Sequence, residues 1–180
     1  RLGGAMITFA LNGQETEFAG DEMTSLLTFL REEKGITSAK DGCSGQAACG
    51  ACLVEVGGKA ALACSTPMHK VAGKEIVTLE GWPQSLLRTL GRAFVSKGAV
   101  QCGFCTPGFL TRTKILLEKN PAPTRPEVVK AIRSHLCRCT GYVKIVDAVL
   151  EAAAAHGKAV WILDRPNPAG RPVEGLTLRT

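Results

Sequence analysis

The eight cysteines constrain this chain more than any other feature, because they form two groups of four with none left over. The first cysteine set follows the spacing C-x5-C-x2-C-x11-C and consists of Cys43, Cys49, Cys52 and Cys64. The second cysteine set reads C-x2-C, a long interval and then C-x-C, and consists of Cys102, Cys105, Cys137 and Cys139. A C-x-C pair is too cramped to close on itself as a low-strain disulfide, because its side chains diverge. It can still offer two thiolates to an inorganic cluster whose irons are separate attachment points, so the spacing predicts two iron–sulfur clusters.

Zinc and disulfides are the competing explanations for these cysteines. The first cysteine set is close to the plant-type ferredoxin spacing C-x4-C-x2-C…C, with one additional residue between Cys43 and Cys49, and it suits a [2Fe–2S] cluster. Zinc also takes four thiolates, but usually from two C-x2-C knuckles, and each set has only one. Disulfide frameworks are typical of secreted chains, and no secretory signal is visible here. A zinc- or disulfide-stabilised adaptor, which would be colourless, stays open as an alternative.

Composition and charge exclude several classes of protein. The 180 residues allow one domain or two small ones, and 45% hydrophobic residues are enough for a packed core. The formal net charge is +6, but no Lys/Arg run is interleaved with aromatic residues, so nucleic-acid binding is not expected. No run of about 18 apolar residues occurs, so we expect no membrane span. The sequence also lacks a Ser/His/Asp arrangement, a phosphate loop and a dinucleotide fingerprint, so we expect no catalytic residue in this chain.

The two ends of the chain are predicted to lie outside its folded part. Residues 1–5 precede the first methionine and lack the apolar segment of a signal peptide, so we expect an N-terminal extension there. Residues 158–180 combine proline and arginine with little periodicity, which predicts an extended C-terminal tail. We expect a cytoplasmic protein, or a periplasmic one if an upstream export signal has been removed.

Short strands dominate the first half of the chain. We expect strands at residues 6–11, 14–18, 53–56, 60–64 and 76–79. The dipeptide Asn12-Gly13 is a strong hairpin-turn signal between the first two strands. A helix is expected over residues 25–33, with Asp21 or Thr24 as its N-cap. Five short strands with one helix laid across them predict a β-grasp layout.

Helical periodicity replaces the strand signals near residue 82. We expect helices over residues 85–96, from Pro107 to Asn120, from the capping box Thr124-Arg125-Pro126-Glu127 onward, and over residues 143–155. Val95 and Val129 are counted among the apolar residues that indicate two of these helices. The cysteine pairs of the second set fall at helix ends, which two antiparallel helix pairs would bring together. We therefore predict two domains, at residues 6–81 and 82–157.

Three segments that carry the cysteines resemble one family of proteins. They read DGC…CGAC at residues 41–52, QCGFCTPG at residues 101–108 and CRCTGY at residues 137–142. Together they resemble the iron–sulfur subunit of the molybdenum hydroxylases, the group of xanthine dehydrogenase, aldehyde oxidoreductase and carbon monoxide dehydrogenase. The resemblance covers residues 6–156 and implies an α+β protein. It implies an N-terminal β-grasp, plant-type ferredoxin-like [2Fe–2S] domain followed by a four-helix-bundle [2Fe–2S] domain.

The resemblance also implies partners and site residues. It implies a large subunit that holds molybdenum with a molybdopterin, and a medium subunit that holds FAD. Gln101 and Cys139 match the family's residues that approach the pterin, so the second cluster is expected to face the large subunit. The first cluster would then face the flavin or an external acceptor.

The sequence therefore predicts an electron-transfer subunit of a molybdenum-containing hydroxylase. Such a subunit passes electrons through two [2Fe–2S] clusters to FAD or an external acceptor and does not touch the substrate. A free-standing two-cluster ferredoxin-type electron carrier is the alternative. Gln101 and the long tail favour a fixed partner over a shuttle.

Overall fold

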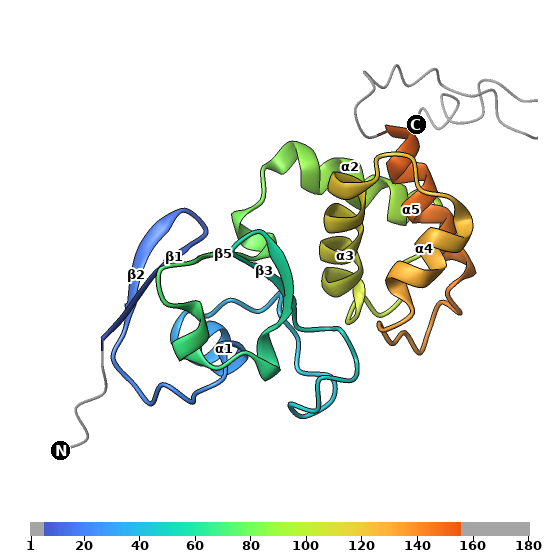
Figure 1. Ribbon diagram of the computed structural model, residues 1–180. Helices are drawn as coiled ribbons and strands as arrows, with labels where there is room; N and C mark the ends of the chain where they lie inside the picture. Colours follow the sequence, from blue (N-terminus) through green and yellow to red (C-terminus); the bar gives the residue numbers. More distant parts are fainter. Residues whose placement is uncertain (1–5, 156–180) are drawn as a thin grey trace, which may run out of the picture.

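The computed structural model describes residues 6–155, which fold into a strand-rich first half and a helical second half (Figure 1). The strands are β1 (Ile7–Leu11), β2 (Gln14–Phe18), β3 (Leu53–Val56), β4 (Lys59–Leu62) and β5 (Glu75–Val77). The helices are α1 (Leu26–Thr28), α2 (Gln84–Ser96), α3 (Thr106–Lys119), α4 (Arg125–Ile132) and α5 (Val143–Ala155). Shorter helical turns are η1 (Phe29–Glu33), η2 (Ala63–Ser65), η3 (Met68–Val71) and η4 (Leu79–Gly81). The protein is thus α+β, as expected, while the expected N-terminal extension and C-terminal tail lie outside the described residues.

The five strands form one sheet in the order β2-β1-β5-β3-β4. Strands β1 and β5 run parallel, and the other neighbours run antiparallel. Each strand lies within two residues of its expected position, and the Asn12-Gly13 turn joins β1 to β2 as predicted. Asn12 and Gly13 have φ values of 51° and 80°. A two-residue hairpin turn requires such left-handed values, which asparagine and glycine tolerate.

The segment α1–η1 packs on the sheet and closes the first core. The ring of Phe29 in η1 lies edge-on to Phe9 of β1 and to Phe18 of β2, with ring centroids 5.4 Å apart in both pairs. Each such aromatic pair is worth about 0.5–1.5 kcal/mol beyond the burial of its surface. This packing fixes η1, from whose end the loop with the first cysteine set departs.

The first helical segment begins at a different N-cap from those expected. The cap is Ser25, whose hydroxyl accepts a hydrogen bond from the N–H of Thr28 at 3.1 Å. Asp21 instead closes the preceding turn by accepting a backbone hydrogen bond at 2.9 Å. The expectation of Asp21 or Thr24 was therefore wrong. Only the residue directly before the first helical position brings its side-chain oxygen to the free N–H groups.

Four helices in the second half enclose a second core. Helices α2 and α4 both pack on α5, and α3 packs on α4 and on strand β3. The capping box predicted at the start of α4 is present, with Thr124 and Glu127 each bonding the other's backbone N–H. The largest fully buried side chains of this core include Leu90, Phe94, Phe109, Leu117 and Ile145. Among the described residues, none of the helices has the length and apolar character needed to cross a membrane.

Two valines that the sequence counted among the apolar residues of these helices face solvent. Val95 of α2 is 71% exposed and Val129 of α4 is 49% exposed. Each directly follows a fully buried neighbour, Phe94 or Val128. Successive residues of an α-helix point about 100° apart, so burial of the first residue turns the second one outward. The buried face of each helix is therefore narrower than the face that all of its apolar residues together would cover.

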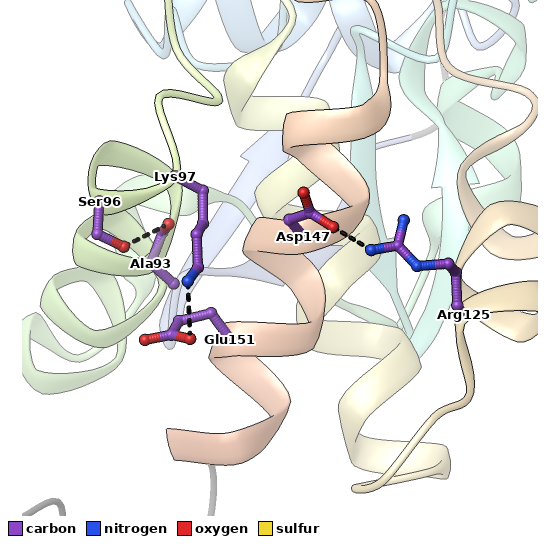
Figure 2. Close-up of polar contacts among 6 residues, drawn as sticks. All are labelled: Ala93, Ser96, Lys97, Arg125, Asp147 and Glu151. Carbon is purple, nitrogen blue, oxygen red and sulfur yellow. Dashed lines mark hydrogen bonds and ion pairs between the residues drawn. The ribbon is translucent and has the colours of Figure 1, made fainter. Parts of the chain in front are cut away.

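Ion pairs on the surface connect α5 to its two neighbours (Figure 2). Lys97, the C-cap residue of α2, lies 3.3 Å from Glu151 of α5. Arg125 of α4 pairs with Asp147 of α5 on the other side. All four side chains are at least one-third exposed. Exposed pairs of this kind contribute about 0–1 kcal/mol, so packing rather than charge holds α5 in place.

A buried ion pair joins the helical half to the sheet. Lys114 of α3 donates to Glu55 of β3 at 2.9 Å and to Glu118 one turn along the helix at 2.7 Å. Its ammonium group also lies 5.9 Å from the ring centre of Trp82, which is buried where the two halves meet. Burial lowers the pKa of Lys114, but Glu118 and Glu55 outweigh this effect and hold the pKa above its ordinary value. Lys114 therefore stays charged and links the two halves.

Glu80 in η4 provides a pH-dependent contact in the first half. Its carboxylate accepts hydrogen bonds from the N–H and the hydroxyl of Ser38, at 3.0 and 2.6 Å, and from the hydroxyl of Thr78 at 2.8 Å. Partial burial raises the pKa of Glu80, but the bonds from Ser38 and Thr78 outweigh it and hold the pKa below its ordinary value. The ionised form is thus favoured by folding.

We expect Glu80→Gln to lower the free energy of unfolding at pH 7 by about 1 kcal/mol, because charge-assisted hydrogen bonds are lost. A carboxyl group with a lowered pKa contributes stability above its unfolded pKa of about 4.3, and loses it as the pH falls. The difference between variant and wild type should therefore shrink below about pH 4 in urea unfolding curves. Glu17→Gln, an exposed carboxylate on β2, serves as the control. An equal effect of both substitutions at every pH would contradict this role of Glu80.

Candidate metal centres

The first cysteine set is held by the loop between η1 and β3 together with the turn η2. Cys43, Cys49 and Cys52 lie on the loop, and Cys64 lies in η2, just beyond strand β4, rather than on the strand as expected. The loop has no regular secondary structure, and five of its residues adopt left-handed φ values: Gly35, Ser44, Gly45, Ala47 and Gly50. Alternation of such residues with right-handed ones curls a backbone into a concave nest of N–H groups that favours negative charge.

Backbone N–H groups surround the outermost thiol of the first set. The Cys43 sulfur accepts hydrogen bonds from the N–H groups of Ala48, Cys49 and Gln46, and these bonds hold the pKa of Cys43 below its ordinary value. Cys49 and Cys52 are buried. Burial raises the pKa of both thiols, that of Cys52 to about 12. A bare thiolate is therefore unfavourable at the inner side of the loop, whereas a metal ion would supply the positive charge that keeps a coordinating thiol deprotonated.

The second cysteine set is assembled from two helix connections. Cys102 and Cys105 immediately precede α3, and Cys137 and Cys139 lie between α4 and α5. The sulfur atoms of Cys102 and Cys139 are 3.5 Å apart. The thiols of Cys105 and Cys137 are close enough for each to shift the pKa of the other. The fold thus brings together two cysteine pairs that are more than thirty residues apart in the chain.

Burial and hydrogen bonding distinguish the four thiols of the second set. Burial raises the pKa of Cys105 to about 12, and the neighbouring thiol of Cys137 adds to the rise. Burial acts on Cys137 in the same direction, but its pKa is held below the ordinary value by Thr140. The Thr140 hydroxyl lies 2.8 Å from the Cys137 sulfur, and its N–H donates to the same sulfur at 3.4 Å. Cys102 and Cys139 are exposed, so one side of this set lies at the protein surface.

The pairing of the thiols fits a two-iron cluster. In each set the sulfurs come together in twos, as Cys43 with Cys49, Cys52 with Cys64, Cys102 with Cys139 and Cys105 with Cys137. Four thiolates shared between two irons require two neighbouring pairs of this kind. Zinc instead takes its ligands at about 2.3 Å around a single point. Within residues 6–155, no group of three His, Cys, Asp or Glu side chains is placed to hold a single metal ion. The arrangement of the sulfurs in twos fits two irons.

Gln101, which the family resemblance placed near a pterin, lies beside the exposed thiol pair. Its side-chain Nε2 donates to the carbonyl of Cys139 at 3.0 Å, so the structure brings these two residues together. Phe104 and Leu136, which neighbour the cysteines of this set in the sequence, are 45% and 56% exposed. Exposed apolar side chains beside a polar site are typical of a surface that a partner covers.

A backbone hydrogen bond connects the two cysteine sets. The N–H of Leu136, the residue before Cys137, donates to the carbonyl of Cys49 at 2.9 Å. A residue of the first set is therefore in direct contact with the residue next to a thiol of the second set. The backbone and this hydrogen bond provide a bonded route between the two sets.

Sequence reasoning assigned no polar role to Tyr142 or Thr140. The Tyr142 hydroxyl accepts the N–H of Cys137 at 3.0 Å and donates to the carbonyl of His135 at 3.1 Å. Thr140 bonds the sulfur of the same cysteine. Their only signal in the sequence is their position in the CRCTGY segment, within five residues of Cys137. The structure buries His135, two residues before Cys137, with its ring against Gly50 of the loop that carries the first cysteine set.

Two family models match the two halves of the chain. The model described as a 2Fe-2S iron-sulfur cluster binding domain matches residues 9–70, which carry the first cysteine set. The model described as a [2Fe-2S] binding domain matches residues 78–150, which carry the second set. A third model, described as the N-terminal part of the exo-beta-N-acetylmuramidase NamZ, matches residues 128–180, of which 156–180 lie outside the described residues.

Well-characterised relatives resemble nearly the whole described part of the chain. The nicotinate dehydrogenase small FeS subunit of Eubacterium barkeri is 43% identical over 147 residues, covering 79% of this chain and 91% of that protein. The nicotine 6-hydroxylase small subunit of Paenarthrobacter nicotinovorans is 41% identical over 151 residues, covering 84% of this chain and 91% of that protein. Both relatives are subunits of similar size to the matched region.

Solved structures share the same fold. Quinoline 2-oxidoreductase from Pseudomonas putida contains a chain with a TM-score of 0.77 and 38% identity, covering 83% of this chain and 94% of that one. The aldehyde oxidoreductase from Desulfovibrio desulfuricans gives a TM-score of 0.78 and 42% identity, covering 83% of this chain. This chain corresponds to only 17% of that longer protein. The same two-part unit therefore occurs both as a separate chain and within a larger one.

Tyr142→Phe tests the hydrogen bonds behind the second cysteine set. Loss of the hydroxyl leaves the N–H of Cys137 and the carbonyl of His135 without this partner, so we expect about 1–2 kcal/mol less unfolding free energy. Urea unfolding of the metal-loaded chain, followed by visible absorbance, measures the loss. Thr89→Val, which removes an exposed hydroxyl bound only to the Ser85 carbonyl, is the control. Equal stability of Tyr142→Phe and wild type would show that the hydroxyl does not support the site.

Proposed function

Because the chain belongs to the family of iron–sulfur subunits of the molybdenum hydroxylases, we propose that it carries electrons from a molybdopterin site on a partner subunit to an acceptor. Relatives that are named small subunits of nicotinate dehydrogenase and nicotine 6-hydroxylase are matched over 91% of their length. The chain is thus the electron-transfer subunit of an oxidoreductase. Substrate conversion belongs to a large molybdopterin subunit in this proposal.

The observation that carries the proposal is the arrangement of the eight cysteines. None of them forms a disulfide within residues 6–155, and within each set of four the thiols lie close together in twos. We assign Cys43, Cys49, Cys52 and Cys64 to a first [2Fe–2S] cluster, and Cys102, Cys105, Cys137 and Cys139 to a second. A [2Fe–2S] cluster supplies one-electron transfer when bound. The chain's own residues hold its irons, exclude water from the buried thiols and donate hydrogen bonds to sulfur.

Hydrogen bonds from the chain to the cysteine sulfurs influence the reduction potential expected at each site. Donors to cluster sulfurs raise reduction potentials. Thr140 acts as such a donor at Cys137, and the loop N–H groups act so at Cys43. Backbone N–H groups donate at both sites. The second site also has the Thr140 hydroxyl 2.8 Å from the Cys137 sulfur, and this difference gives the subunit a means to hold two different potentials.

We infer the direction of electron transfer from the solvent exposure of the cysteine thiols. We place the exposed pair Cys102 and Cys139, together with Gln101, against the molybdopterin of the large subunit. The connection from Leu136 to Cys49 leads inward to the first set. The half-buried Cys43 lies on an exposed loop, and we place it toward the FAD of a medium subunit or an external acceptor. This order requires a fixed partner on the side of the second set, which a free-standing ferredoxin-type carrier lacks.

The finer description of the fold is also a proposal. We interpret residues 6–81 as a β-grasp domain, supported by the parallel β1–β5 pair inside a mixed sheet. We interpret residues 82–157 as a four-helix bundle, supported by the packing of α2 and α4 on α5 and of α3 on α4. In this proposed division into domains, residues 1–5 are an N-terminal extension and residues 158–180 are a C-terminal tail. A cytoplasmic location is part of the proposal, because disulfide frameworks are typical of secreted proteins and all eight cysteines are assigned here as cluster ligands.

The assignment of ligands is tested by removing one thiol from each set. We expect Cys64→Ala to abolish the EPR signal of one [2Fe–2S] centre in the dithionite-reduced chain and to leave the other intact. Cys105→Ala should abolish the opposite signal, because it belongs to the other set. Ser65→Ala, a neighbour of Cys64 in η2, is the matched control and should keep both signals. Iron and sulfide analysis should show half the wild-type content in each cysteine variant.

Two outcomes would overturn the proposed function. A colourless wild-type chain that binds zinc in place of iron would remove the electron-transfer role altogether. Loss of both signals from a single cysteine substitution, in a chain that remains folded by circular dichroism, would contradict the division into two independent sets.

A further inference from the structure

A peptide between two cysteines of the first set is enclosed by the helical half. Gly50 lies between Cys49 and Cys52, and Gly108 of α3 faces its carbonyl group. A methyl group on Gly108 would lie 2.5 Å from the Gly50 oxygen and 3.2 Å from the Cα atom of Ala51. Both of these neighbours are backbone atoms, so no flexible side chain can move aside to relieve the overlap. Only glycine at position 108 lets α3 approach the loop this closely.

His135 encloses the same peptide from another side. A methyl group on Gly50 would lie 2.8 Å from the ring atoms Cγ and Cδ2 of His135, and 3.0 Å from the carbonyl oxygen of Ser134. Gly50 also has a φ of 72°, which L side chains rarely adopt. The peptide at Gly50 is therefore held between the start of α3 and the ring of His135.

His135 is itself held firmly. Its side chain is 1% exposed, and its ring packs on Phe109 with centroids 5.2 Å apart. Its N–H donates to the carbonyl of Ile132 at 2.9 Å, and its carbonyl accepts the hydroxyl of Tyr142 at 3.1 Å. The ring atom Nδ1 lies 3.5 Å from the hydroxyl of Ser134, and Nε2 is buried without a hydrogen-bond partner among residues 6–155. The ring meets the loop through its carbon atoms Cγ and Cδ2, which face Gly50.

We propose that Gly50, Gly108 and His135 form a clamp that fixes the distance and orientation between the two clusters. Each member neighbours an assigned ligand in the sequence: Gly50 follows Cys49, Gly108 follows Cys105 by three residues, and His135 precedes Cys137 by two. The inference rests on the proposed function and gives these three residues a positioning role in electron transfer. The hydrogen bond from Leu136 to Cys49 lies directly beside the clamp.

The clamp has a measurable physical consequence. Electron tunnelling and magnetic dipolar coupling between two centres both fall steeply as the distance grows. Contacts between backbone atoms and a buried ring leave the loop little freedom to move away from the helices. Loosening the clamp therefore weakens the coupling between the clusters while both ligand sets stay complete.

The test uses the full chain loaded with both clusters. Gly108→Ala pushes α3 away from the loop, and His135→Ala removes the ring that presses on Gly50. His135→Phe keeps a ring of similar shape and lacks the nitrogens. Gly91→Ala is the matched control, because Gly91 also lies within a helix but has no atom within 4 Å of its Cβ position.

Two measurements report on the clamp. Pulsed EPR of the dithionite-reduced protein measures the dipolar coupling between the two centres, and hydrogen–deuterium exchange measures the protection of the Leu136 N–H. We expect Gly108→Ala and His135→Ala to weaken the coupling and to lose the protection. His135→Phe and Gly91→Ala should retain both at the wild-type level. Iron and sulfide contents should be unchanged in all four variants.

Wild-type coupling and protection in both Gly108→Ala and His135→Ala would overturn the clamp, and so would a wild-type protein without measurable coupling between its two reduced clusters. If Gly108→Ala does not fold, His135→Ala and His135→Phe are compared instead. Equal dipolar coupling and equal protection of the Leu136 N–H in these two variants would then overturn the clamp. A wild-type chain that holds no iron overturns the proposed function and the clamp's role together. Failure of the clamp can be told from failure of the proposed function, because the protein holds both clusters in the first case and none in the second.

Discussion

A buried thiolate is stable only beside positive charge or hydrogen-bond donors, and both cysteine sets are built around this requirement. Burial raises the pKa of Cys52 and of Cys105 to about 12, so these thiols need the charge of a metal to ionise. Two other thiols receive hydrogen bonds from the chain itself, from loop N–H groups at Cys43 and from the N–H of Thr140 at Cys137. The irregular backbone of the first loop follows from the same need, because regular strands and helices already use their own N–H groups.

The regular elements serve to hold these two irregular regions against each other. The sheet anchors one loop and the helices anchor the other, and the buried pair Lys114–Glu55 links α3 to β3. Removing one partner of a buried ion pair leaves an uncompensated charge, so such a pair fixes a joint firmly even where it adds little net stability. The hydrogen bond from Leu136 to Cys49 then joins the two cysteine sets directly. An electron carrier benefits from this rigidity, because it works at a fixed distance between centres.

Most of the secondary structure could be predicted from local signals. The hairpin at Asn12-Gly13 and the capping box at Thr124 depend on residues only a few positions apart, and both appear where the sequence indicated. The differences between sequence pattern and structure have tertiary causes. The cap moved to Ser25 because packing of the following residues decides which position is the first helical one. Val95 and Val129 face outward because each helix turns its strongest apolar residues toward the core, and the side chains next to them must point elsewhere.

The spacing of the eight cysteines along the chain predicted their division into two sets, because it limits which thiols can share one cluster. The pattern of residues also indicated the α+β order and the family. The folded structure was needed to see which thiols are buried, that Cys102 and Cys139 lie at the surface, and that Gly108 touches Gly50. These features join residues far apart in the chain. Their geometry depends on how two cores pack against each other, and no local pattern of residues encodes that packing.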